Sequence, residues 1–131
     1  MTGHTRALVL VGALLVGAAH LQAQQAPAGQ PDTVALRAAR ATLRSDLRNF
    51  LVAQERYFAD HATYARSLSE MATIYVPSRG VTIVLLTAAN TGHSEIAIID
   101  RVPGMVCGLF VGNSPSPFGT GNEGEVVCRE P

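Results

Sequence analysis

The stretch from Asp32 to Asp60 contains neither glycine nor proline, and its periodicity predicts one long helix. Large apolar residues recur in it at spacings of three, four and seven, which gathers them on one helix face. This apolar stripe consists of Leu36, Leu43, Leu47, Phe50, Leu51, Tyr57 and Phe58. Pro31 and Asp32 supply start signals, with Asp32 the best N-cap candidate. A helix with one apolar face must bury that face, so the rest of the chain is expected to provide a covering surface.

The second half of the chain predicts that surface as an antiparallel sheet. The segments rich in β-branched and aliphatic residues are 81–88, 94–100, 105–111 and, shorter, 125–129. Asn90 and Gly92 stand between the first two, where a hairpin loop needs a positive φ, and Pro103 with Gly104 turns the second into the third. The expected fold class is α+β: one long N-terminal helix packed on a small antiparallel sheet of three or four strands.

The start of the chain has the layout of a secretory signal peptide: a short basic region, an apolar run and a polar segment. The apolar run, Ala7 to Ala19, would form a helix about 20 Å long, too short for a hydrocarbon core of about 30 Å. We interpret residues 1–23 as a signal peptide, cleaved after Ala23 or Ala19, and residues 24–31 as a flexible linker. Residues 32–131 would then form one exported domain, periplasmic or extracellular, without a stable membrane span. An uncleaved signal anchor is the alternative.

Cys107 and Cys128 are the two cysteines of the chain. Behind an export signal, an oxidising compartment favours a disulfide between them. The disulfide would tie the last strand to the third and close a loop rich in proline and glycine. Two free buried thiols are the alternative.

Three segments resemble the globular domain of bacterial type IV pilins and pseudopilins. Asp46 to Leu68 (DLRNFLVAQERYFADHATYARSL) is similar to the end of their long helix and the following loop, and Gly80 to Asn113 is similar, with gaps, to their strands. The span from Cys107 to Cys128 is similar to their C-terminal disulfide-closed loop. The resemblance implies a pilin-like fold over nearly all of the exported domain. The chain departs from the family at its start, because the apolar run lacks an acidic residue and a linker follows it, so the usual means of filament assembly is missing.

No residue pattern indicates catalysis, a cofactor or a metal site. Residues 119–124 satisfy G-x-G-x-x-G, but a Pro-rich loop precedes them and a strand follows, so a flexible turn is the better interpretation. His61 and His93 lack the spacing of metal ligands and are expected to cap the helix or lie at the surface. Glu123 and Glu125 are interpreted as solvated charges, with weak calcium binding as the alternative.

Arg37, Arg40, Arg44 and Arg48 form an arginine stripe beside the apolar one. Like charges at i, i+4 spacing repel each other, and no acidic residue stands at i±3 or i±4 from Arg44. The stripe is therefore a candidate interaction surface for an acidic partner. A solvated face, or pairing with the domain's own Glu123, Glu125 or Glu130, is the alternative.

Charge and pattern together favour a non-enzymatic function. Without Arg6 the exported chain has nine arginines, no lysine and ten acidic residues, a balance that does not predict nucleic-acid binding. We expect a structural or protein-interaction role in the cell envelope, through self-association or contacts with type IV pilus or type II secretion components. A small secreted ligand-binding protein or enzyme on the same fold, or a true structural pilin that retains its N-terminal helix, are the alternatives.

Overall fold

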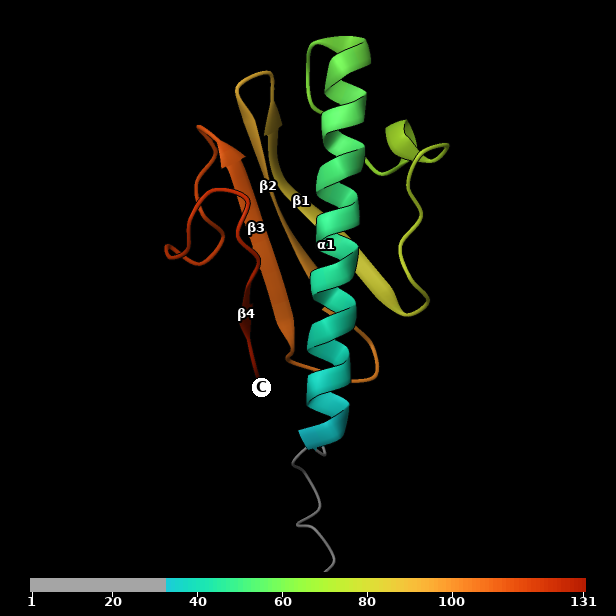
Figure 1. The fold of residues 1–131 in the computed structure, drawn as a ribbon, viewed down its shortest axis with the longest axis vertical. Helices are drawn as coiled ribbons and strands as arrows, with labels where there is room; N and C mark the ends of the chain where they lie inside the picture. The colour runs from blue at the N-terminus through green and yellow to red at the C-terminus, as the bar shows by residue number, and fades with distance from the viewer. Residues whose placement is uncertain (1–32) are drawn as a thin grey trace, which may run out of the picture. The chain divides into compact units, whose positions relative to one another are not determined.

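The structure, a computed structural model, describes residues 33–131. The expected signal peptide (residues 1–23), the linker (residues 24–31) and the N-cap candidate Asp32 lie outside the described residues. The elements are helix α1 (Thr33–His61), the short 3-10 helix η1 (Ser69–Met71) and strands β1 (Val81–Ala89), β2 (Gly92–Ile99), β3 (Val106–Gly112) and β4 (Val127–Arg129) (Figure 1). The α+β class is therefore confirmed.

Helix α1 confirms the long uninterrupted helix expected from the sequence. It ends where Ala62 adopts a φ of 55°, while the Ala62 N–H still donates to the carbonyl of Phe58 at 2.8 Å. Glycine usually occupies such a left-handed position because a Cβ disfavours it, so this helix end carries no clear sequence signal. Within residues 33–131, no helix is both long and apolar enough to cross a membrane.

The four strands form one antiparallel sheet in the order β1-β2-β3-β4, as the meander predicted. Pro103 and Gly104 form the expected turn between β2 and β3, and Gly104 has a φ of 88° there. The expectation for the first hairpin is wrong, since neither Asn90 nor Gly92 has a positive φ. Gly92 is needed for a different reason: a Cβ there would lie 2.3 Å from the carbonyl oxygen of Val111.

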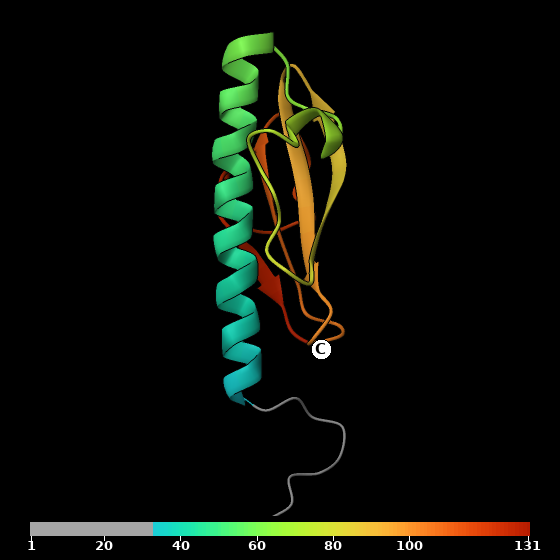
Figure 2. The same ribbon diagram turned by 90° about the vertical axis from the view of Figure 1, so that its right-hand side faces the viewer.

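Helix α1 covers one face of the sheet, and the core lies between these two layers (Figure 2). Leu43, Leu47 and Phe50 of the apolar stripe are completely buried, whereas Leu36, Leu51 and Tyr57 are partly buried at its margins. The sheet contributes alternate residues of each strand, which share one face. These include Ile83, Ala97, Ile99, Cys107 and Leu109.

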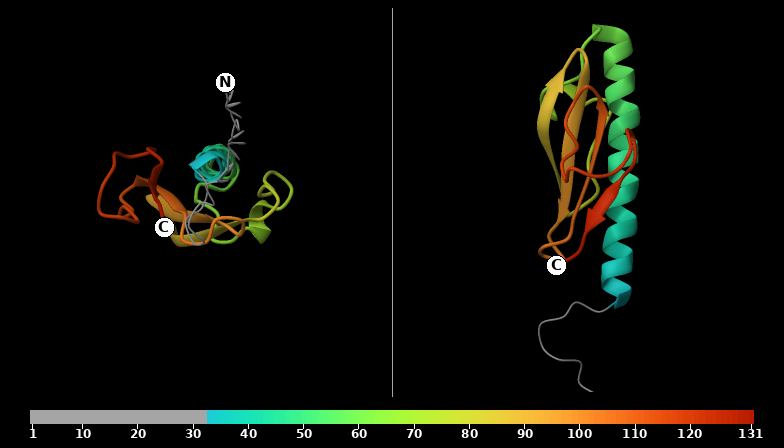
Figure 3. Two further views of the ribbon diagram at one scale, coloured as in Figure 1. Left: turned by 90° about the horizontal axis from the view of Figure 1, so that it is seen from below. Right: turned by 90° about the vertical axis from the view of Figure 1, so that its left-hand side faces the viewer.

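Two buried polar residues of α1 hold the αβ-connection, residues 62–80, against the helix. The side-chain amide of Gln54 binds both backbone groups of Ala65, donating to the carbonyl at 3.0 Å and accepting from the N–H at 2.8 Å. The Asp46 carboxylate accepts from the Ser78 hydroxyl at 2.9 Å and from its N–H at 3.1 Å. The αβ-connection and the loop after β3 lie beyond opposite edges of the sheet in the view from below (Figure 3).

The C-terminal part of the chain returns along β3. Cys107 and Cys128 lie directly opposite each other on β3 and β4 and form a disulfide, which confirms the expected pairing. The loop between them is also held by hydrogen bonds: the Gly124 N–H donates to the carbonyl of Phe110 at 2.9 Å, and the Gly112 N–H donates to the Glu123 carboxylate at 2.7 Å. The loop is therefore held by backbone and side-chain hydrogen bonds as well as by the disulfide.

Candidate functional site

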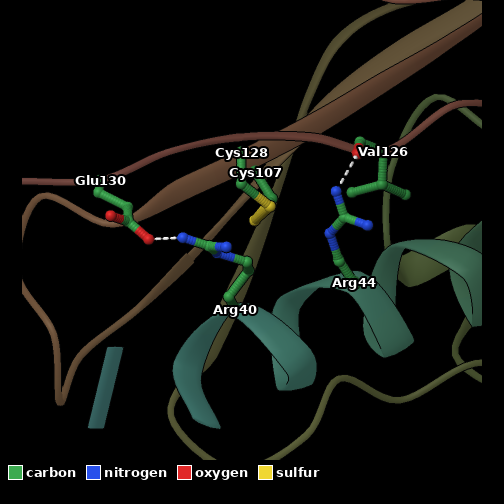
Figure 4. Close-up of a disulfide and its surroundings, with 6 residues drawn as sticks. All are labelled: Arg40, Arg44, Cys107, Val126, Cys128 and Glu130. Carbon is green, nitrogen blue, oxygen red and sulfur yellow. Dashed lines mark hydrogen bonds and ion pairs between the residues drawn. A yellow bond between two sulfur atoms is a disulfide. The ribbon is translucent and has the colours of Figure 1, made fainter. Parts of the chain in front are cut away.

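Two members of the arginine stripe bind the C-terminal segment, residues 126–131. Arg40 forms an ion pair with Glu130, and Arg44 donates from Nη2 to the carbonyl of Val126 at 3.1 Å. The disulfide lies between these two contacts (Figure 4). The stripe, the disulfide and β4 thus form one connected arrangement that joins the N-terminal half of α1 to the end of the chain.

This arrangement matches the intramolecular alternative for Arg40, with Glu130 as its partner. Glu123 and Glu125 do not contact the stripe; Glu123 binds Gly112, and Glu125 accepts from the N–H and side chain of Asn122 at 3.0 Å. A side-chain contact to a backbone carbonyl, as made by Arg44, cannot be read from charge spacing. The sequence therefore gave no signal for it.

Arg37 and Arg48 are the two exposed members of the stripe that make no ion pair within residues 33–131. Arg37 lines a hollow of about 230 Å³ together with Thr33, Leu36, Arg40 and Glu130. Glu130 already neutralises Arg40 in this hollow. The interaction role of the stripe stays a prediction, and these two residues are the part of it that remains available.

The expected surface position of His93 is wrong. Its side chain is completely buried on β2, where Nδ1 lies 2.8 Å from Oε2 of the equally buried Glu95. His61, in contrast, is exposed at the end of α1, with Nδ1 2.9 Å from the carbonyl of Tyr57, as expected for a residue that caps the helix. Strand spacing gave a signal for the buried pair: residues 93, 95, 97 and 99 share one face, and Ala97 and Ile99 are apolar.

Burial controls the electrostatics of the His93–Glu95 pair. It raises the pKa of the Glu95 carboxyl, while the hydrogen bond and the charge of His93 act in the opposite direction and are the smaller effects. The Tyr64 ring covers the imidazole, with the two centroids 4.5 Å apart. An acid and a base in contact can exchange a proton, but here no surface of either side chain is open to a substrate.

The sheet face away from α1 exposes apolar side chains. Val84 of β1 is 39% exposed and Ile98 of β2 is 41% exposed; they alternate with buried residues that face the helix. Leu86, 48% exposed, stands at the register shift between Leu85 and Thr87. A hollow of about 400 Å³ lies at the end of β2, lined by Ile98, Ile99, Asp100, Pro103, Gly104, Met105 and Val106.

Residues 119–124 form a turn-rich part of the loop after β3, in which Gly119, Gly121 and Gly124 have positive φ. The turn is as expected, and β4, not a helix, follows it. Among the residues that the structure describes, no three His, Cys, Asp or Glu side chains are grouped closely enough to hold a metal ion.

No family model matches the chain, and no curated protein matches it significantly.

Proposed function

We propose that this chain is an exported, non-enzymatic, pilin-like protein that acts by binding other proteins in the cell envelope. The helix-on-sheet arrangement and the disulfide agree with what the resemblance to type IV pilins implies. The export part of the proposal rests on the sequence of residues 1–23. A link to pilus or secretion components rests on the resemblance.

The observation that carries the interaction role is the apolar surface on the sheet face away from α1. Val84, Leu86 and Ile98 expose between 39% and 48% of their surface in a domain whose other sheet face is already covered. Neighbouring exposed apolar side chains typically mark contact surfaces, whereas isolated ones are normal. This part of the sheet therefore supports a protein-binding role better than a catalytic one.

The proposal of a non-enzymatic role is supported by where the best acid–base pair lies. His93 and Glu95 would be the natural candidates for proton transfer, yet neither has any exposed side-chain surface. A general acid or base has to reach its substrate within hydrogen-bond distance, directly or through one water. The pair is therefore placed to stabilise or regulate the domain.

A second candidate function is the binding of a small apolar ligand. The hollow beside Ile98 and Met105 has about 400 Å³ and mainly apolar lining, which lies in the range of ligand sites. Asp100 is the one acidic residue in that lining. Ile98 is 41% exposed and Met105 is 1% exposed. A small molecule bound in the hollow would therefore change the surroundings of Ile98 more than those of Met105.

Site-specific photo-crosslinking in the native cell envelope tests the interaction role. A photoreactive residue at Val84 or Ile98 should capture a discrete protein partner, because it stands on the proposed contact surface. The matched control is Val52, an equally aliphatic position on α1 that is 68% exposed. The same products from Val52, or none from Val84 and Ile98, would contradict the proposal.

Two further readouts separate the alternatives. Ile98→Thr should abolish partner capture and leave folding intact, because threonine suits a strand but removes apolar surface. If instead the native protein carries a small molecule that Ile98→Thr releases, the ligand-binding function is favoured. The exposed arginines would belong to the contact surface if recovery of the partner falls as salt rises and if Arg37→Gln or Arg48→Gln also reduces it.

A further inference from the structure

The buried His93–Glu95 pair carries two polar atoms that find no partner among the described residues. Nδ1 of His93 and Oε2 of Glu95 are 2.8 Å apart, whereas Nε2 of His93 and Oε1 of Glu95 are buried without a hydrogen bond in residues 33–131. Neither side chain is exposed. A net charge at this place is costly, because burial removes the hydration of the charged group and no donor among the described residues reaches Oε1 of Glu95.

The Tyr64 ring that covers the pair has two carboxylates of the described range acting on it. From the αβ-connection, Tyr64 lies against the imidazole and donates its hydroxyl to Glu55 of α1 at 3.1 Å. Burial raises the pKa of Tyr64, and the charges of Glu55 and Glu123 raise it further, so both carboxylates act on this ring. The strand residues directly opposite His93 and Glu95 are uncharged: Leu85, Ala88, Leu109 and Val111.

We propose that His93 and Glu95 hold one shared proton and act as a pH-sensitive latch beneath Tyr64. With that proton the pair is neutral overall, as an acid bonded to an imidazole or as an imidazolium bonded to a carboxylate. When the proton leaves to solvent, a carboxylate remains that accepts from Nδ1–H. The core then holds a net negative charge on a group with one unpartnered oxygen.

The direction of the pH effect follows from the protons bound in each state. Because burial raises the pKa of Glu95, its contribution to stability is complete at low pH and is lost as the pH rises through the folded value. In the unfolded chain an ordinary imidazole keeps its proton up to about pH 6.5 and an ordinary glutamate loses its proton near pH 4.3, so the two states bind equal numbers of protons only between these two values. We therefore expect the loss in neutral to mildly alkaline solution.

The αβ-connection is the part of the domain that the latch would release. Tyr64 rests on His93, and the next residue, Ala65, is held by Gln54 of α1. A negative charge under Tyr64 would draw water into the site, because a buried carboxylate regains hydration when the site opens. Opening here would expose the Ala65 N–H before the rest of the core unfolds.

Denaturant unfolding of the exported domain, from about pH 6 to pH 8.5, tests the latch with Glu95→Gln. Glutamine keeps the size and a partner for Nδ1 but cannot lose a proton. The unfolding constant of the wild type should rise relative to that of the variant by up to about tenfold per pH unit. The hydrogen-exchange protection of Ala65 should fall over the same range in the wild type alone. Parallel pH profiles for the two proteins would overturn the proposal.

Tyr64→Phe is the matched control, because it keeps the ring on His93 and removes the hydrogen bond to Glu55. It should retain the wild-type pH dependence; loss of that dependence would assign it to Tyr64 and Glu55 instead. If Glu95→Gln does not fold, the ¹³C shift of the Glu95 carboxyl and the ¹⁵N shifts of His93 in the wild type decide. At pH 5, a carboxylate signal for Glu95 together with a neutral-imidazole ¹⁵N signal for His93 would overturn the shared proton. The inference is independent of the proposed function, since partner capture at Val84 and Ile98 can fail while the latch is confirmed.

Discussion

The two halves of helix α1 are attached to the rest of the domain by different chemistry. The N-terminal half meets the C-terminal segment through Arg40 and Arg44, next to a disulfide. The C-terminal half meets the αβ-connection through the buried amide of Gln54, above the buried His93–Glu95 pair. The first attachment consists of arginine contacts to a segment that a disulfide ties to β3. The second depends on hydrogen bonds and one titratable pair.

This difference predicts that the two attachments respond to different conditions. Arginine stays charged at any physiological pH, so the first attachment responds to reductant and salt and hardly to pH. A buried carboxyl with a raised pKa makes the second attachment respond to pH and hardly to salt. The two attachments would therefore respond to different conditions at the two ends of one helix.

Removal of the disulfide should give the largest effect. The double variant Cys107→Ala, Cys128→Ala loses a link across a sequence separation of 21, and closing such a loop reduces the entropy of the unfolded chain. We expect the free energy of unfolding to fall by about 3 kcal/mol, measured by guanidinium denaturation. Reductant should destabilise the wild type by a similar amount and leave the variant unchanged. Equal stability of both proteins would show that strand pairing, the loop hydrogen bonds and the arginine contacts hold the C-terminal segment without the disulfide.

Loss of the Gln54 amide should come next and act at the other end of the helix. Gln54→Leu leaves the N–H and the carbonyl of Ala65 buried without partners. The expected cost is about 2 kcal/mol, because a buried polar group without a hydrogen-bond partner is not compensated for the loss of its hydration. Hydrogen exchange at Ala65 should accelerate more than exchange in β3. Asn49→Ala on the exposed side of α1 is the control and should change stability by less than about 0.5 kcal/mol.

Replacement of Arg44 should give the smallest effect and sharpen the comparison. Arg44→Gln removes the hydrogen bond to the Val126 carbonyl, which should cost about 1 kcal/mol. The control Arg48→Gln removes an exposed arginine that belongs to one like-charge i, i+4 pair, whereas Arg44 belongs to two, and it should leave stability within about 0.5 kcal/mol or raise it slightly. Thermal unfolding at low and high salt measures both. Higher stability of Arg44→Gln than of the wild type would mean that like-charge repulsion outweighs the contact with β4.

The sequence by itself determined the elements and their order. The apolar period of α1, the alternation in the strands, the Pro103–Gly104 turn and the pairing of Cys107 with Cys128 all depend on local rules or on one pair of residues. Such patterns act through neighbours in the chain, so they can be read without knowing which layer meets which.

Only the tertiary structure decided which polar residues the core would enclose. Asp46, Gln54, His93 and Glu95 have polar side chains, and composition predicts such groups at the surface. Each becomes buried because its partner arrives from elsewhere: Ser78 for Asp46, Ala65 for Gln54, and the covering ring of Tyr64 for the His93–Glu95 pair. The same holds for Arg44, whose partner is a backbone carbonyl 82 residues away. A polar group can be buried when its hydrogen bonds are compensated, and that compensation exists only after the helix, the connection and the sheet have come together.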